Sequence, residues 1–443
     1  MNKRYRIVFE SYENNKPETP ISRTTLLEDG IEKPTSLLDL SMGLDKQISL
    51  IQGAGDCVLS EKIGLLGNTR TCSCCKGKLT KLGQHTSTFH DVLTDHKVNM
   101  QRLKCADCGH EEPSTVRTVF NGVESAELMK IQAELGSQHT FRESEHIFSL
   151  FSHKRRQINN HDRIKQVVEK VGQELERLGS EEIKVLKAAP ATELILNVDG
   201  GHLKTTEDQR SIEAMTSVVY RPESLETFSD EGWHYITSKN CAASAKDDSG
   251  VQLISNTIVA ALKQGLTDKT HVTALCDGAE NCWKVVDALR PLAGGMTEIL
   301  DWFHLAMKIK NIALPADYKD NLVKIKWHLW RGRVDRARIR LLELIDLVSG
   351  EYRSRLEKLL LYITNNEGKI VNYRDRKTQG LVFTSNLAES TVESLINQRC
   401  KGHQHMRWSR EGLNPLLQLR AAIASNDWNS RWKTAVLNAI CNA

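Results

Sequence analysis

Three short apolar runs in the middle of the chain each lead into an aspartate. The runs and their aspartates are 194–198 with Asp199, 271–276 with Asp277, and 296–300 with Asp301. Short, mainly hydrophobic runs that lead into an acid, as at Asp199 with two glycines behind it, are typical of buried strands that end in a turn. We therefore expect three strands that each deliver a carboxylate.

Helical spacing of apolar residues fills the sequence between and after these runs. It predicts helices at 251–263 and 280–289, before and after the Asp277 run. Strands joined by crossover helices form a mixed sheet, here with the acids at one edge. A nearly continuous helical pattern then covers 305–372. Four of its apolar residues are expected in contact with a core: Ile339, Leu341, Leu342 and Leu344.

The segment 121–178 has the pattern of three short helices. Thr140 and Glu143 form a capping box that opens the second helix. A basic turn precedes the third helix and carries Lys154, Arg155 and Arg156. Short helices around a basic turn are compatible with helix-turn-helix DNA binding. A small helical bundle with a solvated basic loop has the same pattern.

The first 66 residues have the weakest pattern. Residues 6–9 fit a short strand, residues 10–33 are polar and read as loop, and 34–59 has helical spacing in places. No chemistry is assigned to them.

Charge is unevenly distributed along the chain. The formal net charge of the 443 residues is +4, but 305–385 carries 17 Lys and Arg against 9 Asp and Glu, and 396–443 carries 7 against 2. Positive charge thus flanks Glu389 on both sides, which suits a polyanion held beside it. No secretory h-region follows Met1 and no apolar run is long enough to span a membrane, so a cytoplasmic protein is expected.

Two C-x-x-C pairs, Cys72 with Cys75 and Cys105 with Cys108, predict a metal site. In a cytoplasmic protein, cysteines at such spacing are more typical of metal ligands than of disulfides. Strand-like sequence between the pairs indicates a zinc ribbon holding one structural Zn²⁺, because four thiolates leave no open coordination position. A redox C-x-x-C lacks the βαβ context it needs here. Cys74 can replace Cys72 or Cys75 as a ligand.

The aspartates predict a second metal site if they converge. Carboxylates are the ligands that Mg²⁺ prefers, and two such ions can clamp the attacking and leaving oxygens of a phosphoryl transfer. Each acid taken alone is more typical of a strand-end turn or a helix cap. Glu389, three residues after Asn386, resembles a capping box, and Glu393, one turn later, is the alternative ligand.

Further candidates for DNA contact come from basic residues near aromatic ones. They are Arg333 and Arg336 in the basic run of the helical segment, and Arg407 and Trp408 near the C-terminus. Arginine beside tryptophan fits stacking on unpaired bases next to phosphate contacts. Surface helices and ordinary core aromatics explain the same residues.

The ordered set of motifs resembles the DDE transposases of bacterial insertion sequences, in the branch similar to the eukaryotic Mutator-like enzymes. The motifs that carry the resemblance are Val198-Asp199-Gly, Cys276-Asp277-Gly-Ala, Leu300-Asp301-Trp-Phe-His304 and Asn386-Leu-Ala-Glu389-Ser. The tail with Asn397-Gln-Arg, Met406-Arg-Trp408 and Leu416-Leu-Gln-Leu-Arg420 is also similar. The resemblance spans about Cys72 to Arg420 and leaves 1–66 uncovered.

The resemblance implies a multidomain α/β protein with an RNase H-like mixed sheet flanked by helices. The expected order is an N-terminal region of unassigned role at 1–66, a zinc ribbon at 67–120, a helix-turn-helix domain at 121–185, the first part of the catalytic core at 190–304, an all-helical insertion at 305–384, and the last core helix with a basic tail at 385–443. Asp199, Asp277 and Glu389 are the implied ligands of two Mg²⁺ or Mn²⁺ ions. Asp301 and His304 are implied to be auxiliary.

The implied activity is metal-dependent cleavage of double-stranded DNA at the ends of a mobile element, followed by strand transfer into target DNA. A homo-oligomer on DNA is expected. Two alternatives remain: an inactive or domesticated DNA-binding relative, and another RNase H-like nuclease such as a resolvase.

Overall fold

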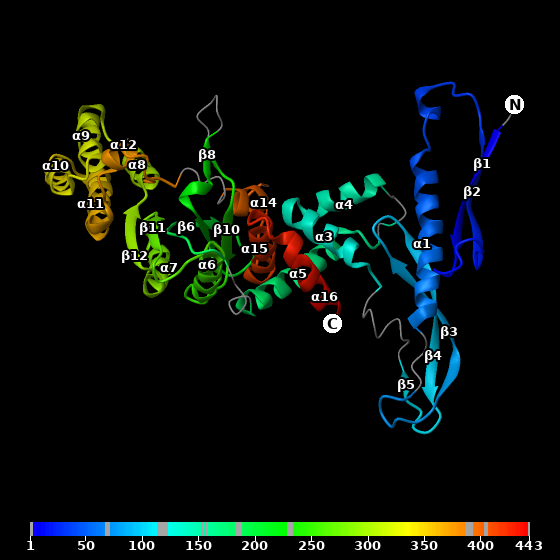
Figure 1. Cartoon of the computed structure of the whole chain (residues 1–443). Coiled ribbons are helices and arrows are strands. Elements are labelled where there is room, and N and C mark those ends of the chain that lie inside the picture. Colours follow the sequence, from blue (N-terminus) through cyan, green and yellow to red (C-terminus); the bar gives the residue numbers. More distant parts are fainter. Residues whose placement is uncertain are drawn as a thin grey trace. The chain divides into compact units, whose positions relative to one another are not determined.

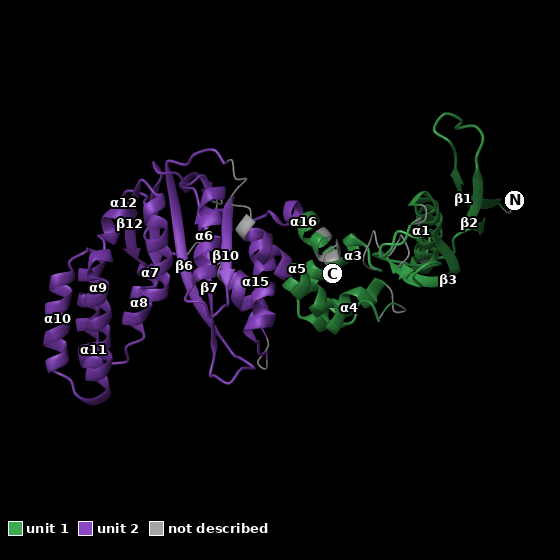
Figure 2. Cartoon of the chain, turned by 90° about the horizontal axis from the view of Figure 1, so that it is seen from below, with its two compact units in different colours: residues 1–171, 432–443 green, residues 172–431 purple. Residues whose placement is uncertain are grey.

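The computed structural model describes residues 3–66, 71–112, 123–151, 155, 157–181, 188–227, 234–385, 393–402 and 406–441. The chain is a mixed α/β protein that divides into two compact units (Figure 2). Unit 1 comprises Met1–Val171 and Trp432–Ala443, and unit 2 comprises Gly172–Arg431. Among the described residues, no helix has the length and apolar character needed to cross a membrane.

Unit 1 begins with a hairpin, a long helix and a three-stranded sheet (Figure 1). Their bounds are β1 Lys3–Ser11, β2 Ser22–Ile31, α1 Leu44–Leu66, β3 Leu79–His90, β4 Asp95–Cys105 and β5 Glu111–Glu112. Antiparallel pairing joins β1 to β2 and orders the second sheet β3-β4-β5. The short strand predicted at 6–9 lies within β1, whereas the loop expected at 10–33 was wrong over half of its length, where β1 ends and β2 runs. Strand β2 is largely exposed, so its sequence lacks the apolar alternation of a half-buried strand.

Three helices follow in the order predicted: α3 Ala126–Gln138, α4 Phe141–Phe151 and α5 His161–Glu181, of which α5 continues into unit 2. The capping box is present, since the Thr140 N–H donates to Glu143 and the Glu143 N–H donates to the Thr140 hydroxyl. The helices share a core of Leu128, Phe148 and Ile164, against which Val92 of the β3–β4 turn also packs. The C-terminal helix, α16 Trp428–Cys441, ends in unit 1.

Unit 2 is built on a five-stranded mixed sheet of order β10-β7-β6-β11-β12. The strands are β6 Glu193–Leu203, β7 Ile212–Tyr220, β10 Lys239–Ser244, β11 His271–Cys276 and β12 Gly295–Leu300. The chain pairs β6, β7 and β10 antiparallel, whereas β11 and β12 run parallel to β6. A separate small hairpin joins β8 Leu225–Thr227 to β9 His234–Ile236.

Helices α6 Val251–Lys263 and α7 Glu280–Leu289 cover one face of this sheet. Alternate residues of β6, namely Leu194, Leu196 and Val198, share a buried core with them. Helix α15 Arg410–Ala424 contacts β10, where the Gln418 amide donates to the Ala243 carbonyl. Cys276 and Cys282 lie in the core as buried thiols, as small apolar residues would.

The segment after β12 is helical, as predicted. It contains α8 Trp302–Lys310, α9 Lys319–Trp330, α10 Val334–Asp346, α11 Gly350–Asn365 and α12 Tyr373–Thr378. Short elements follow, a π-helix at Glu393–Asn397 and α14 Gln398–Cys400. In α10, Leu341 and Leu344 are buried as expected, but Ile339 is 57% and Leu342 49% exposed. Those two predictions were wrong, because both side chains are exposed rather than packed in a core.

The β3–β4 turn of unit 1 is the point to which its neighbouring elements attach. Arg155 is 6% exposed and donates to Asp95 (2.9 Å) and to the carbonyls of Val92 and Asp91. The Ser125 hydroxyl, which caps α3, donates to Asp91. The guanidinium of Arg155 is thus engaged inside the protein, which corrects its assignment as a DNA contact. Lys154 and Arg156 lie outside the described residues.

We predict that Arg155→Met lowers the free energy of unfolding by on the order of 2 kcal/mol, since hydrogen bonds to charged groups are lost from a buried site. Burial raises the pKa of Asp95, but hydrogen bonds from Arg155 and His90 outweigh it and hold the pKa below its ordinary value. The stabilisation is therefore present above the ordinary carboxyl pKa and is lost as pH falls through the lowered one.

Urea unfolding at neutral and acidic pH measures both effects. The matched control is Arg102→Met, which removes an exposed pair with Glu111 and should cost less than about 1 kcal/mol. Full stability of Arg155→Met at neutral pH would contradict the anchoring role.

Candidate metal centres at a cysteine cluster and at the sheet edge

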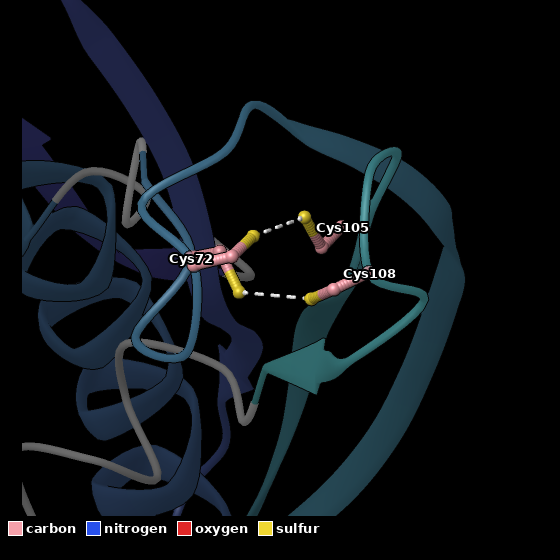
Figure 3. A group of neighbouring side chains, drawn as sticks. Cys72, Cys105 and Cys108 are labelled. Carbon is pink, nitrogen blue, oxygen red and sulfur yellow. Dashed lines mark hydrogen bonds between the residues drawn. The ribbon is translucent and has the colours of Figure 1, made fainter.

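Four cysteines converge at one end of the β3-β4-β5 sheet. The sulfur atoms of Cys72, Cys75, Cys105 and Cys108 all lie within 4.8 Å of one another. Cys72 Sγ is 3.7 Å from Cys108 Sγ, and Cys75 Sγ is 3.4 Å from Cys105 Sγ (Figure 3). Cys74 is exposed and is not part of this group. The cluster can therefore bind a metal such as zinc, with the ligand set predicted from the spacing.

The same turn presents each cysteine pair. After Cys75, Lys76 adopts a left-handed conformation (φ 61°), and after Cys108, Gly109 does so (φ 71°). The Cys72 N–H donates to the Gly77 carbonyl, and the Cys105 N–H donates to the His110 carbonyl. Each left-handed residue reverses the chain, so both thiols of a pair face the same point. The Asp107 N–H also points at Cys105 Sγ, at 3.4 Å.

The unligated thiols have unequal proton affinities. Backbone N–H groups of Cys108 and Asp107 lower the pKa of Cys105 to about 7. The His110 N–H lowers the pKa of Cys108, but neighbouring thiols and burial outweigh it and raise that pKa to about 12. Four close thiols thus resist joint deprotonation unless a cation compensates their charge, which is the function that a bound Zn²⁺ serves in such a cluster.

The second candidate centre lies at one level of three parallel strands, where β11 and β12 end. Strand β6 continues past this level to Leu203 and stays paired with β7, so the strand end and turn expected at Asp199 were wrong. Val198 of β6 pairs with Cys276 of β11, and Cys276 pairs with Leu300 of β12. The next residue of each strand is the predicted aspartate: Asp199, Asp277 and Asp301. The Asp199 carboxylate accepts from the Gly200 N–H and the Asp277 carboxylate from the Ala279 N–H, both at 2.8 Å.

The surroundings of Asp199 disfavour its charged form. Its pKa is raised above the ordinary value, first by burial and further by the charges of Asp277 and Asp301. His304 and the Gly200 N–H act in the opposite direction but do not cancel these effects. A desolvated carboxylate among like charges is stabilised when a divalent cation binds beside it.

Asp301 has a different environment from Asp199 although it ends the neighbouring run. It is 1% exposed and caps α8, accepting from the N–H groups of Phe303 and His304. Its carboxylate also accepts from His304 Nδ1 (2.7 Å) and from the N–H and hydroxyl of Ser385 (2.8 and 2.7 Å). Burial raises its pKa, but the hydrogen bonds from His304 and Ser385 outweigh burial and lower it. Asp301 thus fastens the start of α8 to Ser385.

Glu389 lies outside the described residues, but the chain on both sides of it is held at this edge. Before it, Ser385 is bound to Asp301. After it, Ile396 and Lys401 lie beside Gly201 of β6, where an added Cβ would be 3.6 Å from each. Arg420 of α15 donates to the carbonyls of Ser394 and Leu395 and secures this return segment.

Glu393, the alternative third ligand, is exposed and accepts a hydrogen bond from the Asn397 amide. Among the described residues, the carboxylates of the edge do not form a group of three converging ligands.

The helical segment contacts the Asp277 strand end directly. The Tyr362 hydroxyl of α11 donates to the Asp277 carbonyl at 2.5 Å. Gly278 has a φ of 94°, and a Cβ there would lie 2.7 Å from the Tyr362 ring. Asn366, one turn later, accepts from the Trp283 indole N–H of α7. Sequence spacing predicted neither Tyr362 nor Ser385, because their partners lie 85 and 84 residues away in the chain.

The remaining candidates for DNA contact differ in exposure. Arg333 and Arg336 are exposed, and no ion pair to either is formed by the residues that the structure describes. Burial lowers the pKa of His328, and the charges of Arg336, Arg333, Arg340 and Arg331 lower it further, which marks a concentration of positive charge. Arg407 is also exposed.

Trp408 is 8% exposed, and its indole N–H donates to the Cys400 carbonyl. It is therefore a packing residue, which corrects its assignment to DNA stacking. The aromatic ring of Trp408 is apolar surface that the fold buries.

Compared with known proteins, the chain matches no protein-family model and no curated protein.

We predict that freshly purified protein contains about one equivalent of zinc per chain, measured by elemental analysis. Cys105→Ser should lose the metal and the cooperative unfolding of the β3-β4-β5 sheet, because metal binding and folding are coupled in such sites. Cys74→Ser is the matched control and should retain the metal. Metal-free wild-type protein, or equal loss in Cys74→Ser, would rule out this ligand set.

Proposed function

We propose that the chain is a DDE transposase similar to the Mutator-like branch, which binds the ends of its mobile element, cleaves DNA and transfers the strand to a target. The observation that carries the proposal is the register of β6, β11 and β12. It brings Asp199, within β6, beside Asp277, at the end of β11, and the anchors on either side of Glu389 lie at the same edge.

An RNase H-like core is part of this proposal. Its support is a sheet whose first strand, β6, is flanked by the antiparallel pair β7 and β10 on one side and by parallel β11 and β12 on the other. The helical segment between β12 and Glu389 corresponds to the insertion that the motif resemblance implies. The cysteine cluster and the α3–α5 helices precede this core in the implied order.

Asp199, Asp277 and Glu389 are the residues that would hold two Mg²⁺ or Mn²⁺ ions. When bound, the ions supply activation of a water or 3′-hydroxyl nucleophile and stabilisation of the leaving oxygen. The raised pKa of Asp199 is the feature of the described residues that fits a cation here.

The chain's own side chains position the backbone around the proposed metal ligands. Tyr362 fixes the backbone carbonyl of Asp277, and Asp301 fixes Ser385 ahead of the Glu389 segment. Arg333 and Arg336 supply positive charge for phosphates, since counterion release drives much of protein–DNA affinity.

Substitutions of the sheet-edge acids distinguish the proposed transposase from a non-catalytic DNA-binding relative. Asp199→Asn and Asp277→Asn should each lower Mg²⁺-dependent DNA cleavage by about 10³-fold or more, while DNA affinity stays near wild type. Asp199→Asn should also keep or raise stability near neutral pH, because a carboxylate with a raised folded-state pKa is less favourable when charged in the folded protein.

Asp301→Asn is the contrasting variant. Its carboxylate has a lowered pKa and several donors, so the variant should lose about 1–3 kcal/mol of stability at neutral pH. Glu393→Gln is the control and should cleave normally. Normal cleavage by the Asp199 and Asp277 variants would leave only a DNA-binding protein. Cleavage confined to branched junctions, without joining of element ends to target, would favour the resolvase alternative.

We predict that the double variant Arg333→Glu, Arg336→Glu weakens DNA binding and reduces the slope of log K against log salt, because phosphate contacts and their released counterions are lost. Fluorescence anisotropy across a salt series measures both quantities. The equal-charge control is Arg353→Glu, Arg355→Glu on α11, whose arginines pair with Glu357 and Glu351. If log K falls with log salt at the same slope in both double variants, Arg333 and Arg336 are ordinary surface residues without phosphate contacts.

A further inference from the structure

A lysine ammonium occupies the space that Gly201 leaves on β6, next to Asp199. Side chains alternate along a strand, so Asp199 and Gly201 face the same side of the sheet, opposite to the side on which Val198 packs in the core. Gly201 has no side chain of its own, and an added Cβ would lie 3.6 Å from Lys401 Nζ. Neighbouring side-chain positions on one face are roughly 7 Å apart. The ammonium of Lys401 therefore lies one such position beyond Asp199.

The backbone that carries Lys401 is fixed on both sides. The Lys401 N–H donates to the Asn397 carbonyl at 2.8 Å. Cys400 is 2% exposed, and its carbonyl accepts from the Trp408 indole N–H. The Trp408 N–H donates in turn to the carbonyl of Lys204, directly after β6. The start of the Lys401 side chain is thus held in place relative to β6.

A second ammonium lies near the turn that follows Asp277. Lys308 of α8 places its Nζ over the ring of Tyr362, 4.5 Å from the ring centroid. The hydroxyl of the same ring donates to the Asp277 carbonyl, and the ring lies against Gly278. A cation over an aromatic face is attracted by the ring, so Tyr362 orients Lys308 as well as the Asp277 turn.

Neither ammonium is neutralised by the described part of the chain. Both side chains are exposed, and no carboxylate of the described residues forms an ion pair with Lys401 or Lys308. Other lysines of unit 2 do have such partners, namely Lys263, Lys284 and Lys369. Positive charge beside an acidic edge opposes the repulsion that the acids exert on a polyanion. The two ammonium groups are therefore available to bind phosphate.

We propose that Lys401 and Lys308 bind the phosphates on either side of the scissile phosphate, one lysine on each side. The inference rests on the proposed function, because it takes the edge at Asp199 and Asp277 as the place of cleavage. A DNA strand that crosses this edge meets Lys308 on the β11 side and Lys401 on the β6 side. Lysine suits this task because it binds phosphate as a point charge. In the purely structural alternative, the aliphatic part of Lys401 only covers Gly201.

The test begins with the position at which the wild type, with Mg²⁺, cleaves duplex DNA from the two flanks of its coding region. Lys401→Met and Lys308→Met should each lower the cleavage rate there by about 10-fold or more, because a hydrogen bond to a charged group is lost. Methionine keeps the apolar part of the side chain, so the melting temperature should stay near that of the wild type. Lys401→Arg should restore most of the rate.

The matched control is Lys269→Met, which changes an exposed lysine just before β11, at the end of that strand opposite Asp277. This variant should cleave at the rate of the wild type. An equal loss of rate in Lys269→Met would overturn the inference, because the loss would then follow from the charge of the whole protein.

Neutral phosphate analogues identify the phosphate that each lysine contacts. A single methylphosphonate on either side of the cleavage position should slow the wild type. In Lys401→Met one of these two effects should disappear, and in Lys308→Met the other, because a contact already removed from the protein cannot be removed again from the DNA.

Wild-type rates in both lysine variants, or methylphosphonate effects that persist in both, would overturn this inference and leave the proposed function standing. A wild type that does not cleave would overturn the proposed function and the inference together.

Discussion

The acidic edge of unit 2 depends on the register of three parallel strands. Val198, Cys276 and Leu300 occupy the same level of the sheet, so the residues that follow them must be neighbours. A slip of one residue in β11 would turn its core-facing side chains to the opposite face. Burial of Val272, Ala274 and Cys276 against α6 and α7 opposes that slip. Hydrophobic packing on one face of the sheet thus determines where the carboxylates lie at its end.

Asp199 and Asp301 have different physical roles, because Asp301 has hydrogen-bond partners that Asp199 lacks, one of them far away in the sequence. Asp199 is desolvated among like charges, which raises its pKa and favours a cation nearby. Asp301 is buried more deeply, yet Ser385 and His304 satisfy its carboxylate and lower its pKa. The charge of Asp199 is unfavourable in the folded protein, and a bound cation would relieve it. The hydrogen bonds of Asp301 instead stabilise the fold and fix Ser385. The helical segment adds a third contribution, because Tyr362 holds the turn after β11.

Sequence-based prediction succeeded for the features that leave a local pattern in the sequence. The strands before Asp199, Asp277 and Asp301 are short, mainly apolar runs, and the cysteine ligands have characteristic spacing, so both could be predicted. The second strand of the β1–β2 hairpin could not, because its largely exposed residues lack alternation. Residue type also misled for Arg155 and Trp408, since neither positive charge nor aromaticity reveals that a side chain is buried with its hydrogen bonds satisfied. Ser385 and Tyr362 act through partners more than 80 residues away, at positions that no local period marks.

The central claim is that Asp199 and Asp277 hold a divalent cation together. Anomalous diffraction from crystals soaked in Mn²⁺ tests it most directly, because Mn²⁺ replaces Mg²⁺ at oxygen sites and is identified by its own scattering. The account predicts an anomalous peak within about 2.0–2.3 Å of carboxylate oxygens of both Asp199 and Asp277, with Asp301 unligated. No peak at saturating Mn²⁺, or a peak bound by Asp301 without Asp199, would contradict it.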